Sequence, residues 1–194
     1  TDWGRRNGYA LDKFGKIWVI LDYTTRTFQN TPIDNVVIKN IYGNYDSFYA
    51  VDEFGHLWSW FRNNYGKLGT GNTSYVATPV KIFDKEKVIH VSTHKTHTLF
   101  VTESGKVYAM GDNQYGELGT GNFVNSSIPV QVKNLQDIVK VSSGDGFSAA
   151  LDKQGRVWAW GYAAMGALGN NFSISRQAPS TAIGNELPNM KIDN

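Results

Sequence analysis

Val157-Trp158-Ala159-Trp160-Gly161 decides the fold of this chain, because two earlier stretches repeat it in register. The same plan occurs fifty residues before it, at 107–111, and a hundred residues before it, at 57–61. A Gly-x-Leu-Gly motif follows each stretch, at 66–69, 116–119 and 166–169. A fixed internal period of this length is typical of solenoids, propellers and arrays. The repeat therefore outweighs any local signal in predicting the architecture.

Each unit contains four short extended segments, of which the third is the stretch quoted above. Its side chains alternate between two faces, as expected for a β-strand. A hairpin motif, Asp-x-x-Gly or a variant, precedes it at 12–15, 52–55, 103–105 and 152–155. Glycine there takes a positive φ without steric cost. A proline is predicted to open the fourth segment, at Pro79, Pro129 and Pro179. The pattern predicts an all-β chain of four-stranded antiparallel meanders.

The chain divides into four units, at about 1–46, 47–96, 97–146 and 147–194, within a single repeat domain. The first unit is degenerate. The step from Phe14 to the equivalent Phe54 is 40 residues and not 50, and the Gly-x-Leu-Gly motif is missing between Tyr23 and Pro32. Loops tolerate such deletions better than strands do, so we expect the missing residues in one loop.

Composition excludes several classes of function. The formal charge is +2, from 19 basic and 17 acidic residues, without the clustered basic stripe of a nucleic-acid-binding domain. The chain has no cysteine, which excludes disulfides, thiol catalysis and Cys-type zinc sites. The formal charge gives no reason to expect a nucleic acid as a partner. No apolar stretch is long enough to span a bilayer, so no membrane is expected either. Composition favours an exported, surface or virion-associated bacterial protein, with a cytoplasmic location also open.

The repeat pattern resembles that of the regulator of chromosome condensation repeat family. The match is best from Val107 to Val141, which contains Asn113, Tyr115-Gly116, Leu118-Gly119 and Thr120-Gly121. Phe61 departs from the family pattern, since glycine stands at the equivalent positions 111 and 161. The resemblance implies a β-propeller of four-stranded blades, with seven blades in the best-known members.

About four blades are expected from this length. Seven blades of this size need roughly 350 residues, and the chain has 194. Three arrangements stay open: part of a longer propeller, a small closed ring, and an open arc completed by another copy or chain. In a closed ring, Met190 to Ile192 would pair beside the strand at Tyr9 to Asp12. The first arrangement requires continuation in a longer chain, and the third allows self-association.

No reaction chemistry is encoded in a recognisable pattern. His90, His94 and His97 lie in a strand and turn, where their spacing does not place three imidazoles on one side of a metal. Each Asp-x-x-Gly turn offers one carboxylate, whereas calcium takes six to eight oxygens. The glycine-rich stretches at 69–72 and 119–122 lack the Lys-Ser/Thr of a phosphate-binding loop. We predict no catalytic, cofactor or metal site and no enzyme activity.

The expected function is protein–protein interaction. Three alternatives stay open: a structural or adhesive domain of a bacterial surface or phage assembly, guanine-nucleotide exchange on a small GTPase, and inhibition of an enzyme. The exchange activity of the family's founder is linked to a hairpin that projects from one blade. Plant ultraviolet receptors that resemble this family use a tryptophan cluster as a chromophore. Here the six tryptophans are predicted to pack the blades together.

Turns of a four-stranded meander alternate between two ends of the blade. The first–second and third–fourth connections therefore share one face, which carries nearly all the variation between units. Aromatic and arginine side chains dominate interface hot spots, and rigid scaffolds present functional residues on loops. The predicted partner-binding residues are Tyr45, Phe61, Arg62, Tyr75, His94, Lys95, Asp112, Phe123, Asp145, Tyr162 and Phe172. The alternative for Tyr75, Phe123 and Phe172 is that they fold back onto their own loops.

Overall fold

A computed structural model describes residues 8–22, 27–30, 33, 36–44, 46–164, 168–169 and 175–181. In these ranges the regular structure is β-strand except for one 3-10 turn, η1 (Asn64–Gly66). The strands form four separate antiparallel sheets, which we call blades 1 to 4. The prediction of an all-β chain built from antiparallel meanders is confirmed.

Blade 1 has three strands and the other blades have four. Blade 1 consists of β1 (Gly8–Leu11), β2 (Ile17–Asp22) and β3 (Thr27–Asn30). Blade 2 consists of β4 (Ile38–Gly43), β5 (Ser47–Asp52), β6 (Leu57–Phe61) and β7 (Val76–Phe83). Blade 3 consists of β8 (Val88–Thr93), β9 (His97–Thr102), β10 (Val107–Gly111) and β11 (Ser126–Gln131). Blade 4 consists of β12 (Ile138–Ser143), β13 (Phe147–Asp152), β14 (Val157–Gly161) and β15 (Arg176–Thr181).

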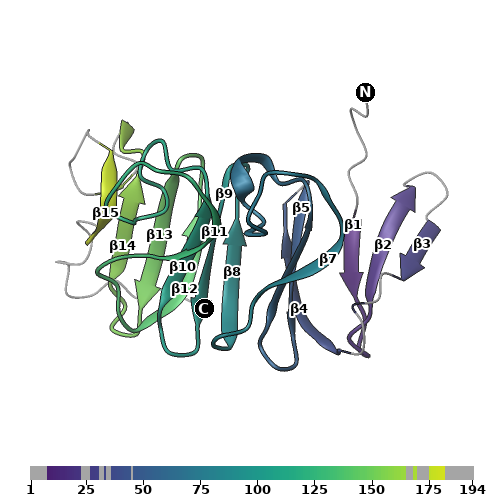
Figure 1. The fold of residues 1–194 in the computed structure, drawn as a ribbon. Helices are drawn as coiled ribbons and strands as arrows, with labels where there is room; N and C mark the ends of the chain where they lie inside the picture. The colour runs from purple at the N-terminus through teal and green to yellow at the C-terminus, as the bar shows by residue number, and fades with distance from the viewer. Residues whose placement is uncertain are drawn as a thin grey trace.

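The blades stand side by side in a row, with blade 1 and blade 4 at opposite ends (Figure 1). Neighbouring blades contact each other through their first strands. For example, the hydroxyl oxygens of Ser92 in β8 and Ser143 in β12 are 2.9 Å apart. The described strands therefore form an open arc of a propeller. The predicted pairing of Met190 to Ile192 beside β1 involves residues outside the described ranges.

The fourth strand of a blade starts earlier than the sequence predicted. β7, β11 and β15 each begin three residues before their proline, so the prediction that proline opens the strand is wrong. These strands lie at a sheet edge, and their pairing with the third strand is irregular. Ala109 pairs with Val130 and Gly111 pairs with Ser126, which leaves Pro129 in a bulge. Proline is tolerated there because its missing N–H is not needed in the ladder.

The deletion in the first unit lies in one connection. Four residues, 23–26, separate β2 from β3, whereas fourteen separate β6 from β7, β10 from β11, and β14 from β15. The three described strands of blade 1 therefore match the last three strands of the other blades, and the connection between β2 and β3 is ten residues shorter, as predicted.

Third-strand aromatic side chains fill the junctions between blades. Trp160 is fully buried against Leu99, Val101 and Leu118 of blade 3. Trp60 is buried in the same way against Ile17 of blade 1. The expectation that third-strand aromatics pack against a neighbouring blade is confirmed.

A second set of tryptophans is only half-buried and is held by the hairpin aspartates. The indole Nε1 of Trp158 donates a hydrogen bond to Oδ2 of Asp152 at 3.0 Å. Trp18 and Trp58 make the same contact with Asp12 and Asp52, both at 2.9 Å. The Asp of the Asp-x-x-Gly motif therefore fixes the third strand as well as the turn.

Candidate protein-binding face

The connections of the meanders define two faces of the arc. The first–second turns and the third–fourth loops lie at one end of each blade, and we call this end the long-loop face. The Asp-x-x-Gly hairpins and the links between blades lie at the other end, the hairpin face (Figure 1). This arrangement follows from the antiparallel strand order of the blades.

The hairpin face is regular because it joins the blades. The carbonyl oxygens of the first three hairpin glycines each accept a hydrogen bond from the first strand of the next blade. Gly15 accepts from the N–H of Ile38 at 3.1 Å, and Gly55 accepts from that of Val88 at 2.9 Å. The same bond joins Gly105 to Ile138 at 3.2 Å. The backbone of this face is therefore engaged in blade-to-blade contacts.

The Gly-x-Leu-Gly loops fix the long-loop face to the following blade. Asn63 supports the first of these loops: its Oδ1 accepts from the N–H of Leu68 at 2.9 Å, and its Nδ2 donates to the carbonyl of Asn72 at 2.8 Å. Gly66 has a φ of +80°, and a Cβ at this position would lie 2.6 Å from the Cα of Ser127 in blade 3. Only glycine allows this close approach, so the loop is held rigidly against its neighbour.

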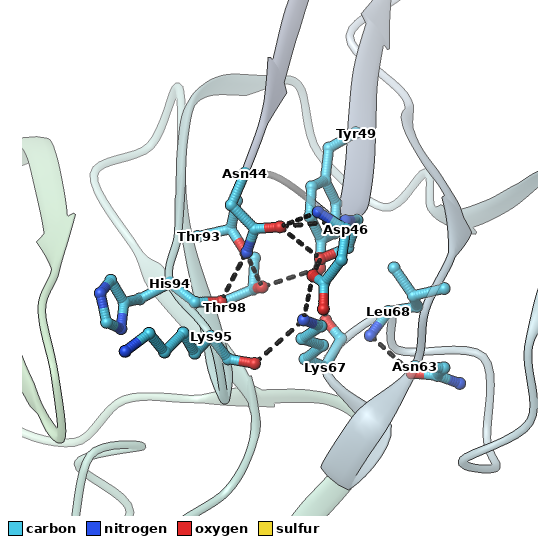
Figure 2. Close-up of polar contacts among 11 residues, drawn as sticks. Asn44, Asp46, Tyr49, Asn63, Lys67, Leu68, Thr93, His94, Lys95 and Thr98 are labelled. Atoms are coloured by element: carbon cyan, nitrogen blue, oxygen red, sulfur yellow. Dashed lines mark hydrogen bonds and ion pairs between the residues drawn. The ribbon is translucent and has the colours of Figure 1, made fainter. Parts of the chain in front are cut away.

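Lys67 is the centre of a buried polar network between blades 2 and 3 (Figure 2). Its Nζ donates to Oδ1 of Asp46 at 2.7 Å and to the carbonyl oxygen of Lys95 at 2.9 Å. The side chain of Lys67 is 0% exposed and that of Asp46 is 11% exposed. Burial lowers the pKa of Lys67, and the ion pair with Asp46 opposes this shift. The ammonium thereby ties two turns and one loop together.

Two further side chains connect the same blades. The hydroxyl of Tyr49 donates to the carbonyl of Lys67 at 2.8 Å and lies 2.8 Å from Oγ1 of Thr98 (Figure 2). Asn44 caps its own turn by accepting the N–H groups of Asp46 and Ser47, each at 3.0 Å. Nδ2 of Asn44 also donates to the carbonyl of His94 at 2.8 Å.

The junction between blades 3 and 4 carries the opposite charge at the equivalent position. Glu117 stands fifty residues after Lys67 and is buried, and burial raises the pKa of its carboxyl. Its Oε2 accepts from the N–H of Tyr115 at 2.9 Å. Its carbonyl oxygen accepts from Nε1 of Trp160 at 2.7 Å and from Oγ of Ser148 at 2.8 Å. The Gly-x-Leu-Gly loop therefore stabilises the junction between blades 3 and 4 through a buried carboxyl, where the preceding junction uses a buried ammonium.

The predicted partner-binding residues differ in how far they reach the surface. Six are exposed: Arg62, Tyr75, Lys95, Phe123, Asp145 and Tyr162. Phe61 and His94 are half-buried, and Tyr45 and Phe172 lie outside the described residues. Tyr75 and Phe123 are 63% and 47% exposed, so neither is buried against its own loop, although the ring of Tyr75 lies 6.1 Å from that of Phe61 at the start of the loop.

Asp112 does not belong to an exposed binding surface, and the prediction for this residue is corrected. It is 3% exposed, and its Oδ1 accepts the N–H of Asn113 at 3.0 Å. The carboxylate caps the start of the loop. A charged loop residue would ordinarily be exposed, which is why the sequence alone was misleading.

Phe61 has a strained backbone. Its φ is +84°, in the region where Gly111 and Gly161 lie in blades 3 and 4. Such a conformation costs a bulky residue about 1–3 kcal/mol. The ring of Phe61 lies 6.1 Å from that of Tyr75 and 5.7 Å from that of Tyr9. The sequence showed the departure from glycine, but only the backbone shows the strain.

The same aromatic cluster contains an unsatisfied donor. Trp60 is 1% exposed, and its Nε1 has no hydrogen-bond partner in the described part of the chain. The equivalent indole of Trp160 binds the loop carbonyl of Glu117. Blade 1 has the shortened loop, so its described residues do not supply Trp60 with a matching acceptor. A comparison of equivalent positions in the repeats, such as Lys67 with Glu117 or Phe61 with Gly111, could have revealed from the sequence that the junctions differ.

The three neighbouring histidines of blade 3 lie in different surroundings. His97 is fully buried, with Nε2 2.9 Å from Oγ of Ser148, and burial lowers its pKa to about 3. The ring of His90 lies 5.8 Å from that of Tyr42. Within the described ranges, no three His, Asp or Glu side chains are grouped as metal ligands. No helix found in those ranges is long and apolar enough to cross a membrane.

Two family models match the repeats. The model of the regulator of chromosome condensation (RCC1) repeat matches residues 55–101 and 104–151. A second model of this repeat matches 88–117 and 138–166. The ultraviolet-B receptor UVR8 of Arabidopsis thaliana is 36% identical over 73 residues, which are 37% of this chain and 17% of the receptor.

Solved structures share the fold. Prp20p of Saccharomyces cerevisiae, described with its binding to Gsp1p and histones, superposes with a TM-score of 0.78 at 18% identity, over 92% of this chain and 48% of that one. Human WBSCR16 superposes with a TM-score of 0.76 at 20% identity, over 92% of this chain and 51% of that one. The chain thus spans about half the length of these structures.

Proposed function

Since the chain belongs to the regulator of chromosome condensation (RCC1) repeat family, we propose that it is a non-enzymatic module that binds a protein partner through its long-loop face. The similar structure of Prp20p is described with its binding to Gsp1p and histones, and yeast RCC1 was solved with Kap60 bound. Protein binding is thus represented among the structural relatives.

The strain at Phe61 carries the proposal. Glycine fills the same backbone position in blades 3 and 4, so the fold does not require an aromatic residue there. Strained conformations persist mainly where function needs them. Phe61 and the exposed Tyr75 form an aromatic pair beside the exposed Arg62, next to the blade that has the shortened loop. Aromatic and arginine side chains of this kind are typical of interface hot spots.

A pair of charge-reversal variants tests which face binds. Crosslinking with mass spectrometry would first identify the partner, and titration calorimetry would then measure its affinity. We expect Arg62→Glu with Lys95→Glu to weaken binding at least tenfold, because both side chains are exposed on the long-loop face. The matched control, Lys13→Glu with Lys153→Glu, changes the hairpin face by the same charge. Loss of binding in the control alone would contradict the assignment.

The variant Phe61→Gly separates function from stability in the same experiment. Glycine relieves the positive φ, but the variant also loses a half-buried ring packed against the core of blades 1 and 2, so the free energy of unfolding should fall by less than the about 3–5 kcal/mol that a core Phe truncation costs. The affinity for the partner should fall. Unchanged affinity in this variant would show that Phe61 and its strained backbone have no role in binding.

Nucleotide exchange on a small GTPase is the second candidate, favoured by the family alone. In blades 2 to 4 the third–fourth loops have the same length, and their described parts contain no projecting hairpin. Release of a fluorescent guanine nucleotide from a panel of GTPases tests this candidate. Catalysed release would replace the proposal of a simple binding module. Structural or adhesive roles and enzyme inhibition remain alternatives without a specific supporting contact.

A further inference from the structure

A hollow of about 620 Å³ opens on the long-loop face between blades 2 and 3. Its lining residues are Asn64, Tyr65, Thr73, Asn125 and Ser127. This volume is comparable to the about 300–1,000 Å³ of small-ligand sites, but the hollow is open to solvent and four of its five lining residues are exposed. Ordinary sites of that size have a mainly apolar lining. Here one aromatic ring is surrounded by amides and hydroxyls.

The backbone around the hollow is fixed by contacts between the two blades and within blade 3. The N–H of Gly71 donates to the carbonyl of Ser127 at 2.8 Å. Oδ1 of Asn125 accepts the N–H of Asn113 at 2.8 Å. Gly66, beside Tyr65, packs directly on Ser127. The walls are therefore preformed, which reduces the entropy lost when a ligand binds.

Most of the polar groups that line the hollow face solvent and are accessible to a ligand. The side chains of Asn64, Thr73 and Ser127 make no hydrogen bond within the described part of the protein, and neither do the hydroxyl of Tyr65 and Nδ2 of Asn125. Amides and hydroxyls both donate and accept hydrogen bonds. None of these five side chains is charged at neutral pH, and charge-assisted contacts to an anion or a cation are therefore missing from the lining.

Tyr65 is the unusual member of this group. Its φ is +62°, a conformation that is uncommon for a residue other than glycine. The side chain is 49% exposed, and no aromatic ring in the described structure contacts it. At the next junction, the repeat-equivalent Tyr115 instead packs on Tyr162 with ring centroids 4.8 Å apart. The strained backbone of Tyr65 therefore places an aromatic ring with no ring partner in the described structure at the hollow.

We propose that this hollow binds a neutral oligosaccharide. The electron-rich face of Tyr65 would receive the C–H face of one sugar ring, since an aromatic ring is negative on its face and positive at its edge. The surrounding amides and hydroxyls match sugar hydroxyls, which also donate and accept. A peptide would need apolar pockets for its side chains, and the lining offers one ring only. This site involves other residues than Phe61 and Arg62, so it stands apart from the proposed protein-binding function.

The test is calorimetric titration of the chain with maltotetraose, cellotetraose and chitotetraose, supported by saturation-transfer NMR. We expect at least one of these probes to bind. The variant Tyr65→Gly should lower its affinity at least tenfold while the melting temperature stays the same or rises, because glycine relieves the positive φ. The variant Tyr65→Ala should also lose binding. The matched control Tyr115→Ala should keep it, because Tyr115 lies outside the hollow.

A second arm of the experiment presents the same glycan on a carrier protein, which distinguishes a free saccharide from a glycoprotein as the source. The proposal is overturned if none of the three probes binds. Binding that survives Tyr65→Gly, or that Tyr115→Ala abolishes equally, overturns it as well. Exclusive binding of a sulfated tetrasaccharide, or of an uncharged peptide in place of the saccharides, would show that the ligand class is wrong.

Discussion

Replacing Lys67 with methionine should destabilise the protein strongly, although the two side chains have similar length. The change removes the ammonium but leaves the Asp46 carboxylate, which is 11% exposed, without its partner at 2.7 Å. The direct attraction at this distance is about 6 kcal/mol at an effective dielectric constant near 20. The cost of desolvating both charges offsets much of it. Breaking a buried pair by removing one partner typically costs about 3–5 kcal/mol, and we expect Lys67→Met to fall in this range.

A double-mutant cycle makes the expectation specific to the pair. Asp46→Asn should also be destabilising, because it removes the negative charge beside the fully buried ammonium and leaves only neutral acceptors, among them the carbonyl of Lys95. The double variant should recover at least half of the summed loss, since no unpaired charge remains. Urea unfolding followed by tryptophan fluorescence gives the free energies, provided the m-value is unchanged.

The exposed pair of Lys81 and Asp84 provides the control. Its atoms are 3.4 Å apart and its side chains are 41% and 55% exposed. Exposed ion pairs contribute about 0–1 kcal/mol, so Lys81→Met should have little effect. A loss below about 1 kcal/mol for Lys67→Met, or strictly additive single variants, would refute the view that the buried pair of Lys67 and Asp46 stabilises the junction at which Nζ reaches the carbonyl of Lys95 in blade 3.

Two further predictions concern stability. Trp160→Ala should cost about 3–5 kcal/mol, because this side chain is fully buried, and the half-buried Trp158→Ala should cost less in the same urea assay. Burial lowers the pKa of His97 to about 3, below its unfolded value, so the unfolded state binds more protons. Stability should therefore fall as the pH drops from about 6.5 toward 3, and His97→Phe, the residue at the equivalent position 147, should flatten this part of the melting-temperature profile.

The sequence predicted the strand plan because each blade repeats the same local pattern. Strand alternation around Trp158 and Trp160, the hairpin glycines and the short loop of the first unit are all local features, and local features survive from unit to unit. The prolines misled the strand boundaries because an edge strand with a bulge accommodates Pro129 inside it. A boundary rule derived from central strands does not apply there.

The candidate site was predictable in its location but not in its contacts. The two faces follow from strand order alone, so the loop positions of Arg62, Lys95 and Tyr162 could be named in advance. The pairing of Lys67 with Asp46, and that of Asn44 with the carbonyl of His94, join segments of different blades or turns. These contacts differ from one junction to the next. A repeat pattern shows only what the units have in common, so it could not predict them. The positive φ of Phe61 and Tyr65 has no signature in side-chain identity alone.

The unequal junctions have a consequence for how the arc opens. Because the main contacts join neighbouring blades, the protein is a quasi-one-dimensional array, in which each junction contributes its own term to stability. All three junctions have an apolar core, to which the first adds a cluster of aromatic rings, the second a buried ammonium and the third a buried carboxyl. Such an array opens in separate cooperative units. Amide hydrogen exchange should therefore show distinct groups of protons with distinct opening energies, divided along the blade boundaries.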